Sequence, residues 1–68
     1  MTAGELIRAR RIELGLSQLQ LAERAGTGQA LVSRIESGRT LPTLSVLQRL
    51  ATALDCDLVL DLTPHSAG

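Results

Sequence analysis

The segment LSQLQLAERAGTGQALVSRIESG, residues 16–38, decides the fold because it specifies two short helices and the turn between them. Ser17 and Gln20 have the S-x-x-Q spacing of a capping box, which predicts that a helix begins here and ends before Gly26. After the turn, a second helix is expected over Gln29–Ser37. The segment therefore predicts a pair of helices joined by a sharp turn.

A further helix is expected on each side of this pair. The sequence T-A-G-E at residues 2–5 has the spacing of another capping box and predicts a helix from about Ala3 to Leu14. Thr43 is a suitable N-cap for a helix from about Leu44 to Leu54. The predicted fold class is therefore all-α, with one compact domain of four helices in residues 1–55.

Inward-facing positions recur at helical spacing in all four segments. In chain order they are Ile7, Arg11, Leu14, Leu21, Ala22, Ala25, Val32, Ile35, Glu36, Leu47, Leu50, Ala51 and Leu54. Two of them carry charge, and a buried charge is stable only when it is paired. We therefore expect Arg11 and Glu36 to form a buried ion pair that links the first helix to the third.

The C-terminal segment, residues 56–68, has a different period. Leucines alternate with other residues over Asp57–Leu62, which predicts a short β-strand that Pro64 ends. No second segment has this period, so the expected partner is the same strand of another copy, paired across a homodimer. The predicted dimerisation residues are Leu58, Val59, Leu60 and Leu62. The alternative is a coil whose leucines pack on the helices.

Composition excludes several classes of site. The chain has 68 residues, and a domain of this size buries only about 60% of the surface of its unfolded chain, so oligomerisation is expected to stabilise it. Cys56 and His65 are the only cysteine and histidine, so no internal disulfide, metal site or cofactor is expected, and Cys56 is expected to be buried. No pair of catalytic groups is evident, which argues against an enzyme. A single cysteine fits a reducing, cytoplasmic location. No membrane contact is expected, since no apolar run is long enough to span a bilayer.

The charges are unevenly distributed although the net charge is zero. All seven basic residues are arginines before residue 50, so residues 1–54 carry +3 and the remaining tail carries −3. Arginine binds phosphate and guanine through two hydrogen bonds. A basic body of this kind is compatible with nucleic acid. Four arginines are expected to be solvated rather than to make contacts: Arg8, Arg10, Arg24 and Arg49.

Residues 18–37 contain a helix-turn-helix pattern. Small Ala22 lies where the two helices cross, Gly26 makes the turn, and Val32 and Ile35 hold the second helix against the first. This arrangement presents the N-terminal half of the second helix to solvent on a rigid support, where it can enter a major groove of DNA.

The linked motifs resemble one known family. They are L-S-Q at 16–18, L-A at 21–22, G-T at 26–27, S-R-I-E-S-G-R at 33–39, Pro42 and Leu47. Together they are similar to the Xre/Cro-type family of phage-repressor-like helix-turn-helix proteins over about residues 4–55. The resemblance implies a lambda-repressor-like helical domain that binds a near-palindromic operator as a homodimer and represses transcription, with autoregulation expected.

The resemblance also implies which residues bind DNA. Gln18 matches a phosphate- and base-anchoring position, and Arg39 with Thr40 matches a loop that meets the DNA backbone. On the recognition helix, Gln29 is suited to adenine and Arg34 to guanine or phosphate. The complete implied set is Gln18, Thr27, Gln29, Ala30, Ser33, Arg34, Arg39 and Thr40. The Arg11–Glu36 pair also matches a family feature.

The chain departs from the family after Leu54, where members usually continue into a fifth helix. Versions that end in a strand resemble antitoxins of type II toxin–antitoxin modules with kinase-type toxins, so a cognate toxin is a second candidate partner. Leu19 and Leu31 have no assigned role. The alternative function is a protein-interaction module of the same fold, which the neutral charge and these leucines favour, whereas the placement of Arg34 and Arg39 favours DNA.

Overall fold

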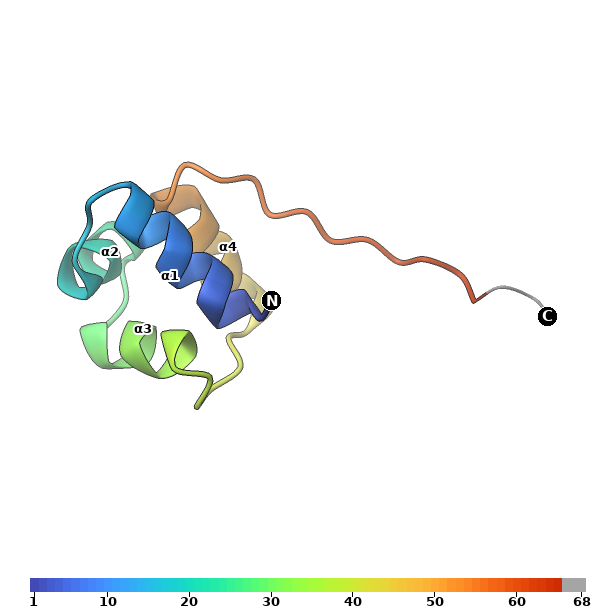
Figure 1. Cartoon of the computed structure of the whole chain (residues 1–68), viewed down its shortest axis with the longest axis horizontal. Helices are drawn as coiled ribbons and strands as arrows, with labels where there is room; N and C mark the ends of the chain where they lie inside the picture. Colours follow the sequence, from blue (N-terminus) through green and yellow to red (C-terminus); the bar gives the residue numbers. More distant parts are fainter. Residues whose placement is uncertain (66–68) are drawn as a thin grey trace.

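The computed structural model describes residues 1–65, which form four α-helices followed by an extended tail (Figure 1). The helices are α1 (Ala3–Glu13), α2 (Gln18–Ala25), α3 (Gln29–Glu36) and α4 (Leu44–Ala53). The predicted all-α architecture of four helices is confirmed, and each boundary lies within one residue of its predicted place. None of the four is long and apolar enough to cross a membrane.

Helices α1, α2 and α4 begin at polar caps, of which the cap of α2 is a complete capping box. The Gln20 N–H donates to Ser17 Oγ at 3.0 Å, and the Ser17 N–H donates to Gln20 Oε1 at 2.8 Å. At α1 the Glu5 N–H donates to Thr2 Oγ1 at 3.1 Å, but the Thr2 hydroxyl in turn donates to Glu5 Oε1. The second half of the predicted box at Thr2 is therefore wrong, because the hydroxyl rather than the backbone N–H holds the Glu5 carboxylate.

A left-handed residue redirects the chain after α4. Asp55 has φ +55° and is the one non-glycine residue of positive φ within residues 1–65. The Cys56 N–H donates back to the Ala51 carbonyl oxygen at 2.9 Å, which closes the helix end. Aspartate tolerates this conformation better than most side chains. The turn sends the tail away from the axis of α4.

The core joins α2 to α3 and α4, and α1 to α3. Its buried apolar residues are Ile7, Leu16, Leu21, Ala22, Ala25, Val32, Ile35, Leu50 and Leu54. Leu14, Leu47 and Ala51, which were predicted to face inward, are only partly buried. Leu31 packs partly against this core, whereas Leu19 is exposed. Fully burying a leucine, isoleucine or valine stabilises the fold by about 1.5–3 kcal/mol each, so this small set supplies most of the packing energy.

Helix α3 lies close to the backbone of α1 at Gly4, a residue for which the sequence predicted no packing role. Gly4 is buried, and a Cβ added to it would overlap the Ile35 carbonyl oxygen and lie 3.2 Å from the Glu36 Cα. Both obstructing atoms belong to the backbone, so a side chain there cannot be relieved by a rotamer change. The crossing of the two helices therefore requires glycine at this position.

Replacing Gly4 by alanine is expected to lower the free energy of unfolding by about 1–3 kcal/mol, because the backbones must move apart. Gly28→Ala is the matched control, since its added Cβ would meet no atom within 4 Å and its φ of −90° suits any residue. The control is expected to change stability by less than about 1 kcal/mol. Urea denaturation followed by circular dichroism measures both, and equal midpoints for the two variants would contradict the close crossing.

The tail, residues 56–65, has no secondary structure and runs away from the helices (Figure 1). Leu58 is half-buried, whereas Val59, Leu60 and Leu62 are 82%, 72% and 89% exposed. The predicted strand is absent from the described part of a single chain, because pairing needs a second strand. The coil alternative is also wrong for Leu60 and Leu62, which contact no helix closely enough to be buried. Cys56 is exposed rather than buried, and residues 66–68 of the predicted tail lie outside the described residues.

Candidate nucleic-acid interface

Helix α3 has one buried and one exposed face. Val32, Ile35 and Glu36 point into the protein, with Val32 and Ile35 almost completely buried. Four of the predicted DNA-binding residues occupy the opposite face and are exposed: Gln29, Ala30, Ser33 and Arg34. The structure therefore brings these four residues together on the exposed surface of a helix whose buried face packs against the core.

The first turn of α3 carries unsatisfied backbone donors. Its N-cap is Gly28, which has no side chain to accept a hydrogen bond from the helix. The first N–H groups of a helix, together with the helix dipole, favour an anion such as a phosphate. Gln29 and Ala30 lie in this first turn, beside the free N–H groups. Thr27, half-buried in the turn before it, lies at the same end of the helix.

Arg11 and Glu36 form a two-bond ion pair between α1 and α3. Arg11 Nε lies 2.7 Å from Glu36 Oε2, and Arg11 Nη2 donates to Oε1 at 2.9 Å. Only 12% of the Arg11 side chain and 3% of the Glu36 side chain are exposed. A third bond, from Arg11 Nη1 to the Leu16 carbonyl oxygen at 2.9 Å, ties in the loop before α2. The hydrogen bonds with Glu36 raise the pKa of Arg11 against the opposing effect of burial, so the guanidinium stays charged.

Gln18 is bonded to the same carboxylate. Its Nε2 donates to Glu36 Oε1 at 3.2 Å, and the residue is half-buried. Gln18 opens α2 and Glu36 closes α3, so this bond joins the two ends of the helix-turn-helix. The sequence indicated an anchoring role for Gln18 but no contact of this kind. No spacing rule covers two residues in different helices.

The loop after α3 turns back on the helix it leaves. The N–H groups of Arg39 and Thr40 both donate to the Arg34 carbonyl oxygen, at 2.9 and 3.3 Å. The Arg39 side chain is exposed and Thr40 is half-buried. The structure thus holds these two predicted residues at the C-terminal end of α3, next to Arg34.

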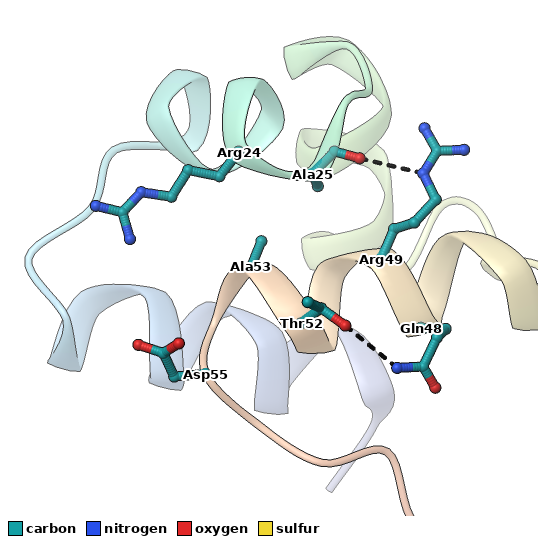
Figure 2. Close-up of a pocket in the computed structure, with 7 residues that line it drawn as sticks. All are labelled: Arg24, Ala25, Gln48, Arg49, Thr52, Ala53 and Asp55. Atoms are coloured by element: carbon teal, nitrogen blue, oxygen red, sulfur yellow. Dashed lines mark hydrogen bonds between the residues drawn. The ribbon is translucent and has the colours of Figure 1, made fainter.

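Two arginines that were expected to be solvated instead bond helix ends. Arg49 of α4 donates from Nε to the Ala25 carbonyl oxygen at 3.1 Å (Figure 2). Its Nη2 also donates to the Gly26 carbonyl oxygen. Arg10 donates from Nε to the Leu54 carbonyl oxygen at 3.1 Å, and its bond to Glu13 raises its pKa. Cations are favoured at the C-terminal ends of helices. Arg49 therefore stabilises the end of α2 beside the turn.

Most of the chain matches a known protein family. Residues 7–60 match the model of the helix-turn-helix family. The chain belongs to the helix-turn-helix family. The resemblance inferred from the motifs is thereby confirmed at the level of this family.

Several relatives of this helix-turn-helix protein are regulators or repressors. An uncharacterized HTH-type transcriptional regulator of Methanothermobacter thermautotrophicus is 42% identical over 57 residues, which cover 84% of this chain and 83% of the relative. The immunity repressor protein of Bacillus phage phi105 is 44% identical over 54 residues, covering 79% of this chain but only 38% of the repressor. This family is not one of enzymes, in agreement with the sequence.

A solved structure shares the fold at substantial sequence identity. The P22 c2 repressor protein, in complex with synthetic operator 9T in the presence of Tl⁺, superposes with a TM-score of 0.79. It is 35% identical, and the match covers 84% of this chain and 86% of that one. The antitoxin role receives no support from these relatives and stays a prediction from the sequence.

Proposed function

We propose that this protein is a sequence-specific DNA-binding repressor that acts as a homodimer on a near-palindromic operator. The observation that carries the proposal is the exposed face of α3, with Gln29, Ala30, Ser33 and Arg34 on a helix fixed by buried residues. The similarity to the P22 c2 repressor, whose structure was solved with operator DNA, supports it. Repression follows from steric exclusion of other proteins from the occupied site.

Base recognition falls to the exposed face of α3. In the major groove, Arg34 suits the O6 and N7 acceptors of guanine, and Gln29 suits the N6 and N7 groups of adenine. The Ala30 methyl group suits the methyl group of thymine, while Ser33 bonds either donors or acceptors. The exposed side chains of α3 thus offer a hydrogen-bonding pattern that differs from one base pair to the next.

Phosphate contacts would set the orientation of the helix. Gln18, Thr27, Arg39 and Thr40 flank α3 at its two ends and suit the DNA backbone on either side of the groove. The Gln18 amide nitrogen carries two hydrogens, of which Glu36 accepts one. The second hydrogen suits a phosphate oxygen, so the buried ion pair would orient an amide that binds DNA.

The homodimer would place two copies of α3 in successive major grooves, about 34 Å apart. The tail residues Leu58, Val59, Leu60 and Leu62 are the proposed dimer contacts. Their support is that three of the four are largely exposed in a single chain, where large apolar side chains are costly to leave in water. Residues 1–55 are the proposed DNA-binding part and residues 56–68 the proposed dimerisation part.

A titration tests the proposal. Fluorescently labelled DNA from immediately upstream of the gene is titrated at two salt concentrations, with scrambled DNA of equal length as the control. The label is needed because the chain has no Trp, Tyr or Phe. We expect selective binding that weakens steeply with salt, as counterions return to the phosphates. Absence of binding to either DNA at low salt would contradict the proposal and favour the protein-interaction module.

Arg34→Ala is expected to weaken operator binding by about 1–3 kcal/mol and to relax base choice at one position of each half-site. Arg24→Ala is the matched control, because Arg24 is exposed at the end of α2 and lies outside the proposed interface. Binding to a set of single-base operator variants measures the effect. An unchanged ranking of these variants would show that Arg34 does not read a base.

A further inference from the structure

An apolar groove lies on α1 and α4 and takes no part in the proposed DNA interface. Its volume is about 230 Å³, and it is lined by Ala3, Leu6, Ile7, Arg10, Leu47, Ala51, Leu54, Cys56 and Leu58. Helix α1 packs mainly on α3, and helix α4 packs mainly on α2. The groove therefore remains open between α1 and α4. Ile7 and Leu54 are buried beneath it, whereas Leu6 is exposed and Leu47 is half-buried.

The tail starts at the edge of this groove. Cys56 and Leu58 belong to the lining, and beyond them the chain runs away from the helices (Figure 1). In an extended chain Leu58, Leu60 and Leu62 lie on one face, yet Leu60 and Leu62 are largely exposed, at 72% and 89%. One molecule thus has an uncovered apolar groove and an uncovered row of leucines that leads away from it.

We propose that the groove is covered by the tail of a second copy, with Leu60 and Leu62 of the partner subunit packed over Leu6, Leu47 and Ala51. This inference rests on the homodimer proposed above and names the surface that the dimer uses. A two-fold axis near Leu58 makes the two tails antiparallel. Each tail then leaves the groove of its own copy and runs toward the groove of the partner copy. The exchange covers both grooves at once.

Charge favours the same arrangement. With the leucines turned toward the groove, Asp57 and Asp61 lie on the opposite, solvent-facing side of the tail. The tail after residue 54 carries −3 and the helical body carries +3, so a tail of one copy is attracted to the body of another. Arg10 is the one charged residue of the lining, and its guanidinium already donates to Glu13 and to the Leu54 carbonyl oxygen. The contacts that the groove offers to a partner are therefore apolar.

Disulfide trapping between distinguishable copies tests the inference. In a Cys56→Ser background, one copy carries Leu6→Cys and a second, longer-tagged copy carries Leu60→Cys; the two are mixed and oxidised. Both positions are exposed, so both variants should fold. The control replaces Leu6→Cys by Ile12→Cys, an exposed position of α1 that does not line the groove. We expect cross-linked heterodimer at least ~10-fold above the control, because the docked pair has a high effective concentration.

The outcomes separate this inference from the proposed function. Dimers in sedimentation equilibrium without the Leu6–Leu60 cross-link would keep the homodimer and overturn the groove as its interface. An intrachain disulfide in a monomeric Leu6→Cys/Leu60→Cys variant would also overturn the inference, because the groove would then hold its own tail. A purely monomeric parent protein would overturn the proposed homodimer and, with it, the exchange.

Discussion

Replacing Glu36 by alanine is expected to lower the free energy of unfolding by about 3–5 kcal/mol, a large part of the stability of a small domain. The substitution leaves Arg11, whose side chain is 12% exposed, without the carboxylate that binds two of its guanidinium nitrogens. It also removes the acceptor of the Gln18 amide. A buried charge without a partner strongly lowers the free energy of unfolding. The intact pair, by contrast, changes this free energy little relative to well-packed apolar residues of similar volume. Urea denaturation followed by far-UV circular dichroism gives the measurement.

Two further variants keep this prediction testable if Glu36→Ala fails to fold, since small domains have only about 5–15 kcal/mol of stability in total. The double variant Arg11→Met/Glu36→Leu removes both charges and should regain most of the lost stability. Glu13→Ala breaks only the exposed pair with Arg10 and should cost less than about 1 kcal/mol. A Glu36→Ala protein that unfolds at the same urea concentration as the parent would contradict the role of the pair.

A chain that ends at Cys56 is expected to be monomeric and to bind the operator about 10²–10⁴-fold more weakly, because each half-site is then bound independently. The helical body should still fold, since the buried apolar core residues found within residues 1–65 lie between Ile7 and Leu54. The Cys56 N–H also keeps its bond to the Ala51 carbonyl oxygen. Sedimentation equilibrium and DNA titration measure the two effects.

The control for the truncation is a chain that ends at Thr63, which keeps all three leucines of the tail. It should remain dimeric and bind DNA like the parent. Dimers of the chain that ends at Cys56 would refute the tail as the dimerisation segment. Monomers that bind the operator with unchanged affinity would refute the need for a dimer.

Local signals sufficed to predict most of the fold. The Ser17–Gln20 box and Thr43 are short-range capping patterns, and each one marks the start of a helix in the structure. Helical spacing placed Arg11 and Glu36 on inward faces, and the structure brings their side chains together. The caps and the inward faces depend on neighbours a few residues apart. The pairing of Arg11 with Glu36 was predicted from these faces because a buried charge requires a partner.

Other contacts between distant residues could not be predicted in the same way. The bonds from Arg10 to Leu54 and from Arg49 to Ala25 depend on how whole helices pack. The need for glycine at position 4 arises from the backbone of α3, which no pattern near Gly4 reports. The predicted strand in the tail depends on a second chain. The alternation of leucines in the tail correctly indicated an extended backbone, but one sequence does not show whether a second strand pairs with it.

Selection of bound duplexes from a random DNA pool tests whether the homodimer recognises a specific operator, because the pool contains every candidate half-site. The full-length protein is incubated with the pool at low salt, and the recovered DNA is sequenced after several rounds. We expect an inverted repeat whose half-site centres are about 10–10.5 base pairs apart, or a multiple of this, because two copies of α3 bind in one homodimer. A pool without any enriched sequence would contradict specific DNA binding by this helix.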